Sequence, residues 1–171
     1  MRTLMLLRHA KSSWDQPGLD DFDRPLNARG QDAASRMGRY LAQRGQRPDL
    51  ILCSPAVRAR TTCEQVQVEI GDVVVVHLDD LYLATSARLL EACQQIAPDI
   101  GTLALIGHNP GLEALALRLV GSGSARERQR MATKFPTCAL AVIEFERASW
   151  NEIGDGTGRL ARFVRPKDLE D

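Results

Sequence analysis

Leu4-Met5-Leu6-Leu7-Arg8-His9-Ala10-Lys11 places four apolar residues directly before an arginine and a histidine. A short, continuous apolar run of this kind is typical of a buried central strand in a parallel sheet. Such sheets present functional groups at the carboxyl ends of their strands. The stretch therefore predicts a central strand with His9 as a nucleophile at its end and Arg8 as a ligand for a phosphoryl group. An arginine-histidine pair can equally be structural, so this hypothesis depends on the rest of the chain.

Strands and helices alternate along the remaining sequence. Further strands are predicted at 49–53, 73–78, 102–106, 139–145 and 160–164, the last of them antiparallel and at an edge of the sheet. Residues 121–134 are polar and basic and are expected to form a mobile loop with a short helix. The alternation predicts one α/β domain over 1–171 with a mainly parallel sheet, and no linker divides it.

Helix starts in this sequence carry typical capping residues. The expected N-caps are Asn27, Ser54, Ser86 and Asn109, and Pro55 and Pro110 follow two of them at the first helical position. Gly45 is expected to close the first helix. Arg58 then falls in the first turn of its helix, where the helix dipole does not favour a cation. This placement indicates an anionic partner for Arg58.

Composition excludes several classes of function. The 22 basic and 22 acidic residues balance, so nothing indicates electrostatic binding of nucleic acid or of a membrane surface. The four cysteines form no C-x-x-C pair, which argues against a zinc knuckle and favours a reduced, cytoplasmic protein. The apolar run near the N-terminus is too short for a signal peptide or a membrane-spanning helix.

Four side chains follow strands or begin helices: Arg8, His9, Arg58 and His108. In an open α/β sheet, positions of this kind converge on one crevice outside the strand ends. Arginine binds phosphate oxygens in a fork, and phosphoryl transfer depends mainly on positioning and charge stabilisation. The four residues therefore predict a phosphate pocket with a histidine nucleophile. A metal site made by His9, His77 and His108 is the alternative, but no recognised ligand spacing supports it.

Three motifs resemble those of the histidine phosphatase superfamily, which also contains the phosphoglycerate mutases. They are Leu7-Arg8-His9-Ala10, Ser54-Pro55-Ala56-Val57-Arg58-Ala59 and Gly107-His108-Asn109-Pro110-Gly111. The short length, Asp23-Arg24-Pro25-Leu26, Leu81-Tyr82-Leu83 and the Gly-His-Asn-Pro-Gly box are most similar to the SixA-type phosphohistidine phosphatases. The resemblance spans about Arg2 to Val120, and more loosely the final strands.

This resemblance implies a three-layer α/β/α fold of the phosphoglycerate mutase type, with an antiparallel edge strand. It also implies a hydrolase that uses neither a metal nor an organic cofactor. His9 matches the histidine that becomes transiently phosphorylated, and Arg8, Arg58 and His108 match the rest of the phosphate pocket. Asn109 is a further candidate phosphate ligand.

The sequence departs from the family pattern in two places. Trp14 is followed by Asp15, where mutases and many broad phosphatases have Asn, so Lys11 or Ser12 is the candidate phosphate contact from this loop. The connection after the third strand is also short, which leaves Asp80, ahead of Asp79, as the candidate general acid.

The leaving group separates the possible substrates. An alkoxide is very basic, whereas the histidine side chain has a pKa of about 6.5, so a site with a poor acid suits phosphohistidine. The predicted function is removal of phosphoryl groups from a phosphohistidine protein, such as a component of a phosphorelay. A phosphatase for small phosphate esters is the nearest alternative. A non-catalytic phosphate-binding module and a mutase are less favoured, because a binder needs no nucleophile and no cap resembles that of a mutase.

Overall fold

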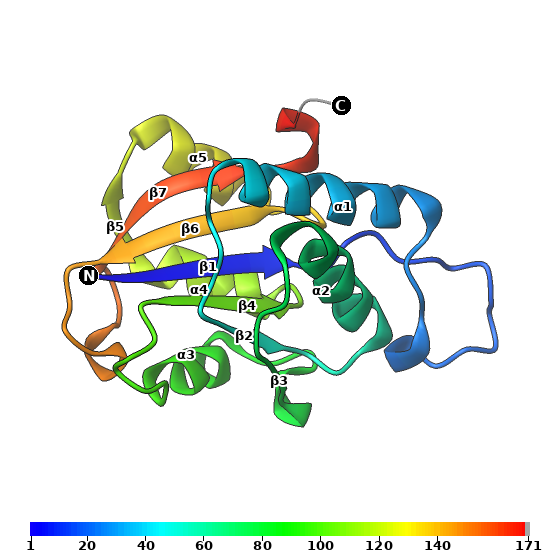
Figure 1. The fold of residues 1–171 in the computed structure, drawn as a ribbon, viewed down its shortest axis with the longest axis horizontal. Coiled ribbons are helices and arrows are strands. Elements are labelled where there is room, and N and C mark those ends of the chain that lie inside the picture. Colours follow the sequence, from blue (N-terminus) through cyan, green and yellow to red (C-terminus); the bar gives the residue numbers. More distant parts are fainter. Residues whose placement is uncertain (170–171) are drawn as a thin grey trace.

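A seven-stranded sheet runs through the middle of the molecule (Figure 1). The computed structural model describes residues 1–169. The sheet order is β3-β2-β4-β1-β6-β7-β5. These strands are β1 (Arg2–Arg8), β2 (Leu50–Cys53), β3 (Val75–His77), β4 (Thr102–Gly107), β5 (Val120–Gly123), β6 (Leu140–Phe145) and β7 (Gly158–Val164). The predicted central strand is therefore β1, which pairs in parallel with β4 and antiparallel with β6.

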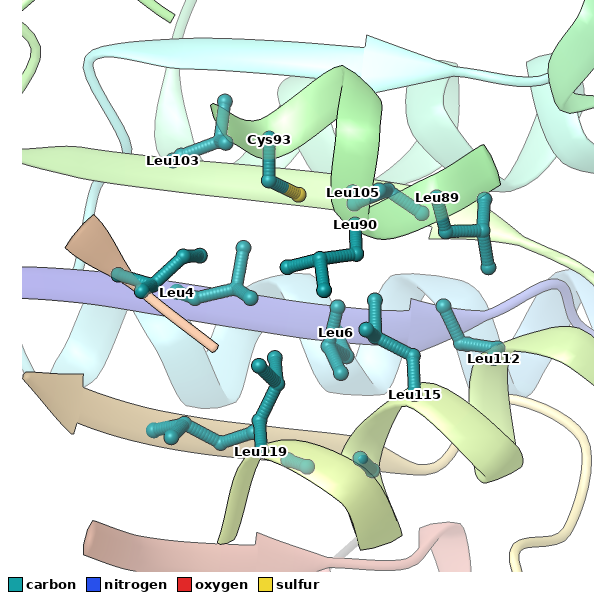
Figure 2. Packing of buried hydrophobic residues seen from close by; sticks show 14 of the residues in the cluster. Leu4, Leu6, Leu89, Leu90, Cys93, Leu103, Leu105, Leu112, Leu115 and Leu119 are labelled. Carbon is teal, nitrogen blue, oxygen red and sulfur yellow. The ribbon is translucent and has the colours of Figure 1, made fainter. Parts of the chain in front are cut away.

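Helices cover both faces of the sheet. One face carries α1 (Ala28–Gln43) and α2 (Val57–Ile70), and the other carries α3 (Ser86–Gln94) and α4 (Gly111–Leu119), while α5 (Ala125–Thr133) lies beside β7. Successive side chains of a strand point to opposite faces. Leu4 and Leu6 of β1 accordingly join the core beneath α3 and α4 (Figure 2), and Met5 and Leu7 join the core beneath α1 and α2.

The predicted fold class is confirmed: the structure is one α/β domain with a mainly parallel sheet. Residues 170 and 171 of the predicted domain 1–171 lie outside the described part of the chain. The position predicted for the antiparallel strand was wrong. The strand that runs opposite to the others is β6, and it lies inside the sheet. The strand predicted at the edge is β7, which is antiparallel to β6 but has β5 paired on its other side.

The strand β5 falls where a loop was predicted. Its glycines and serine lack the alternation of apolar and polar residues that identifies a strand. The pairing of β5 with β7 defines it, and Gly123 adopts a φ of 120° that favours glycine. The short helix expected in this region is α5.

Three helix starts lie one or two residues from the predicted positions. Asn27 does cap α1, because its side chain accepts a hydrogen bond from the Gly30 amide. Thr85, one place earlier, caps α3 in place of Ser86, because its side chain accepts a hydrogen bond from the Arg88 amide. The N-caps of α2 and α4 are Ala56 and Pro110, not Ser54 and Asn109.

The carboxyl ends of the neighbouring strands β1, β4 and β2 lie level with one another. Arg8 of β1 is in register with Gly107 of β4, and Cys53 of β2 is in register with Ile106. The residues that follow, His9, His108 and Ser54, therefore leave the sheet close together.

All four cysteines are buried and free. Over residues 1–169, none of the helices combines the length and the apolar character needed to cross a membrane.

Candidate active site

His9 lies directly beyond the end of β1 and is 7% exposed. Its amide donates to the Gly107 carbonyl, and its carbonyl accepts from the Cys138 amide, both at 3.0 Å. The side-chain Nδ1 lies 2.7 Å from the Ala10 carbonyl oxygen. Because a carbonyl oxygen can only accept, Nδ1 carries the ring proton in this hydrogen bond. The lone pair is thus on Nε2, 3.4 Å from the Arg58 Nε that donates to it.

The surroundings of His9 favour the neutral imidazole. Burial lowers its pKa to about 4, and the nearby cations Arg58, Arg8 and Arg24 act in the same direction. The hydrogen bond to Ala10 opposes this shift but does not reverse it. At neutral pH the ring is therefore uncharged and presents an unprotonated Nε2, the form a nucleophile requires.

Arg58 is the second residue of α2 and is 4% exposed. Its Nη1 donates to the backbone oxygen of Asp21 at 2.7 Å, and its Nη2 lies 3.0 Å from the Asp21 carboxylate. An anionic partner was predicted for Arg58, because the helix dipole does not favour a cation in the first turn. Asp21 is such a partner. It comes from the loop between β1 and α1, so this loop positions Arg58 beside His9.

Asp21 holds more than one side chain of the site. The Tyr82 hydroxyl donates to its carboxylate, and Arg24 binds the other carboxylate oxygen at 2.8 Å. The hydrogen bond from Tyr82 and those from Arg24 and Arg58 hold the pKa of Asp21 well below its usual range. Asp21 therefore stays ionised at all pH values at which the protein would work.

His108 follows β4 and is 2% exposed. Its ring centroid lies 5.1 Å from that of His9 and 5.4 Å from that of Tyr82. Burial, with further contributions from His9 and Arg58, lowers its pKa to about 3, so this imidazole is also neutral. Its Nε2 lies 2.7 Å from the Ser54 hydroxyl, while its buried Nδ1 has no hydrogen-bond partner in the described structure.

The role of Ser54 differs from the predicted helix cap. Its oxygen accepts from the Ala56 amide at 3.3 Å in the turn before α2, and it also contacts His108. When the Ser54 hydroxyl donates to Nε2, the Nδ1 of His108 carries the ring proton and is available as a donor to an anion. This contact could not be foreseen, since it joins residues 54 positions apart.

These side chains border a cavity of about 430 Å³ at the carboxyl edge of the sheet. Its cationic residues are Arg8, Lys11, Arg24, Arg58 and Lys134, and none of the described residues that line it is Asp or Glu. The Arg8 guanidinium donates to the Phe135 carbonyl at 3.0 Å, and its buried Nε has no partner in the described structure. A pocket with this charge is complementary to a phosphoryl group.

Most of the predicted site residues meet in this cavity. Arg8, His9, Lys11, Arg58, His108 and Asn109 all line it. The Asn109 amide is engaged elsewhere, since it donates to the Phe135 carbonyl and its oxygen accepts from the Glu113 amide. Asp80 is not among the lining residues: it is exposed and pairs with Arg88 at 2.5 Å. His77 does not join His9 and His108, and residues 1–169 contain no cluster of three or more metal-ligating side chains.

Sequence reasoning missed several residues of the site. The missed lining residues include Arg24, Leu83, Lys134, Pro136 and Thr137. Sequence reasoning also missed Asp21, which binds Arg58, and Tyr82, whose ring lies against His108. Thr62, also missed, accepts a hydrogen bond from the Ala10 amide at 2.9 Å. The length of the loop over 12–25 was one available signal, because long loops in compact domains are often functional.

Comparison with known proteins relates this chain to the histidine phosphatases. Residues 4–82 match the model of the histidine phosphatase superfamily (branch 1). An uncharacterized chloroplastic protein of Arabidopsis thaliana is 34% identical over 96% of this chain and 78% of its own length.

Two solved structures are similar over nearly the whole chain. A provisionally assigned phosphohistidine phosphatase SixA from Agrobacterium tumefaciens has 34% identity and a TM-score of 0.81, covering 96% of this chain and 98% of its own. A provisionally assigned SixA from Nakamurella multipartitia has 27% identity and a TM-score of 0.83, covering 96% of both chains.

Proposed function

The chain belongs to the histidine phosphatase superfamily, and we propose that it is a phosphohistidine phosphatase acting through a transient phospho-His9. The observation that carries the proposal is a neutral, oriented His9 in a cationic cavity whose described walls hold no carboxylate. The similarity to SixA-type proteins supports the same substrate class.

The first step transfers the phosphoryl group to His9. The Nε2 lone pair attacks phosphorus, and the bond from phosphorus to the substrate nitrogen breaks on the opposite side. The negative charge on the equatorial oxygens is balanced by Arg8 and Arg58, whose guanidinium groups match phosphate geometry. An incoming phosphoryl oxygen would take over the weak hydrogen bond that Arg58 now donates to Nε2 at 3.4 Å.

The lack of a lining carboxylate fits a histidine leaving group. A phosphohistidine whose other ring nitrogen is protonated leaves as a neutral imidazole, so no proton has to be supplied. An ester would leave as an alkoxide and would require a general acid. Asp80 is the acid suggested by the sequence, but its pairing with Arg88 outside the cavity argues against that role.

The second step returns the enzyme to its starting state. A water molecule attacks the phosphorus of phospho-His9, the bond to Nε2 breaks, and inorganic phosphate leaves. His9 departs as a neutral imidazole, because its Nδ1 keeps the proton that it donates to the Ala10 carbonyl. His108 can donate from Nδ1 to a phosphoryl oxygen in both steps, provided that Ser54 donates to its Nε2.

The ionisation of His9 predicts the pH dependence of the reaction. Its pKa of about 4 means that the nucleophile is neutral above this value and protonated below it. We expect kcat/KM to show no loss from His9 protonation down to about pH 5 and to fall about tenfold per pH unit below its pKa. NMR titration of the His9 ring, assigned with His77→Ala and His108→Ala variants, measures this value directly. A midpoint near that of a free histidine would contradict the expectation.

A substrate panel tests the proposal itself. We expect rapid phosphate release from a phosphohistidine protein and from phosphoimidazole, and slow release from small phosphate esters. Asp80→Asn should leave the phosphohistidine rate unchanged, since the leaving imidazole needs no acid. Faster release from esters than from the phosphohistidine substrates would favour a small-molecule phosphatase. Phosphate binding without any turnover would favour a binding module.

A further inference from the structure

A second cavity, of about 1120 Å³, lies between α1, α5 and the segment after β7. We call it the basic groove, because its walls include Arg29, Arg36, Arg126, Arg130, Arg165 and Lys167. Asp32 is the one acidic residue among the described residues that line it. The C-terminal turn (Pro166–Asp168) lies beside α1 (Figure 1), where the Arg36 side chain donates to the carbonyls of Pro166 and Leu169.

The basic groove adjoins the candidate active site. Lys134, Pro136 and Thr137 line both cavities, so the groove meets the pocket of His9 along this short segment. A chain bound in the groove would therefore lie next to the pocket of His9.

The groove holds an excess of positive charge, although the whole chain is neutral. Arg130 pairs with Glu127 and Asp168, and Arg165 also pairs with Asp168. By contrast, Arg29, Arg126, Lys134 and Lys167 are exposed, and the described residues offer none of them an ion pair. Within residues 1–169, these four cations therefore remain available to an anionic ligand.

The uncharged walls of the groove are partly polar, at Gln129, Thr133 and Thr137, and partly apolar. Ala28, Ala33, Pro136 and Pro166 contribute the apolar part, and the stems of the arginines add apolar surface. None of the described residues that line the groove is aromatic, so it offers no platform on which nucleic-acid bases could stack. A surface of this kind is complementary to a polypeptide that carries both carboxylates and aliphatic side chains.

We propose that the basic groove binds an acidic, amphipathic segment of the protein substrate that flanks the phosphohistidine. This inference rests on the proposed function, since it assigns a second contact to the same substrate. Electrostatic attraction of this type mainly accelerates association and weakens as salt screens the charges.

Matched phosphohistidine peptides test the inference. One peptide carries glutamates and leucines on both sides of the phosphohistidine, and the other carries glutamine in place of each glutamate. Phosphoimidazole serves as the substrate without a flanking segment. We expect kcat/KM to be about tenfold higher for the acidic peptide at low ionic strength and this preference to disappear at about 0.5 M salt.

Charge reversal locates the effect. Arg29→Glu combined with Arg126→Glu should abolish the preference for the acidic peptide and leave phosphoimidazole hydrolysis unchanged. Arg128→Glu, compared with Arg126→Glu alone, is the matched control, because both residues are exposed on α5 but only Arg126 lines the groove. Equal rates for the two peptides in the unaltered protein, or an equal loss in the control, would overturn the inference.

Direct binding separates this inference from the catalytic proposal. Fluorescence anisotropy with the unphosphorylated acidic peptide should show binding that is lost in the Arg29→Glu, Arg126→Glu variant, whether or not any substrate turns over. Failure of phosphoimidazole and both peptides to react would count against the proposed function alone. Absence of peptide binding, or tighter binding of a single-stranded DNA of equal charge, would overturn the groove proposal.

Discussion

Replacement of His9 by alanine is expected to lower kcat/KM for phosphohistidine hydrolysis by at least about 10⁴-fold, as is typical when a covalent nucleophile is removed. The remaining cations could still bind a phosphoryl group, but no neighbouring group could take the place of Nε2. His108 lies close by, with a ring centroid 5.1 Å from that of His9, yet its Nε2 is engaged by Ser54. Steady-state phosphate release at matched enzyme concentrations measures the loss.

His77→Ala is the appropriate control, because His77 is exposed at the end of β3 and does not line the cavity. It should retain full activity. Rapid-quench trapping should also detect an acid-labile phosphoenzyme in the unaltered protein and none in His9→Ala. Circular dichroism should show that both variants are folded. Retention of turnover by a folded His9→Ala protein would exclude His9 as the nucleophile.

Replacement of Arg58 by methionine is expected to lower kcat/KM by about 10²- to 10³-fold, the usual cost of losing a group that stabilises transition-state charge. The Arg58 Nε lies 3.4 Å from Nε2 of His9, the proposed nucleophile, and two hydrogen bonds to Asp21 orient the Arg58 side chain. Lysine should restore the activity only in part, because it cannot reproduce the guanidinium fork.

The same replacement should change the pH profile. Arg58 lowers the pKa of His9, so its removal should raise that pKa and move the acid limb of kcat/KM toward higher pH. Arg60→Met, on the same helix and exposed, is the control and should change neither quantity. An unchanged acid limb together with unchanged kcat/KM in Arg58→Met would show that Arg58 does not act on the reacting groups. Thermal unfolding identifies any loss caused by instability.

The fold could be predicted largely because its core strands are locally encoded. Strands β1, β2, β4 and β6 are buried on both faces, so each contains a continuous apolar run. Such a run can be recognised in the sequence without knowing which strands pair with it. The weakly patterned β5 could not be identified, because its partner β7 lies more than 30 residues away and its own residues favour a turn. The antiparallel position of β6 likewise depends on its long-range pairing with β1.

The positions of Arg8, His9, Arg58 and His108 were predictable for a related reason. Each follows a recognisable strand or begins a helix, and the carboxyl ends of parallel strands meet at one edge. The register of β1 with β4 then places the two histidines side by side. Local sequence is therefore enough to predict that these four side chains gather at the carboxyl ends of the strands.

The sequence by itself determined the α/β class and the four residues at the centre of the cationic cavity, because both depend on short apolar runs and the residues that end them. Tertiary structure alone decided that Asp21 orients Arg58, that Ser54 contacts His108, and that Asp80 pairs away from the cavity. It also placed α1, α5 and the C-terminal turn around one basic groove. These features join residues far apart in the chain, and their side-chain contacts depend on how helices and loops pack against the finished sheet.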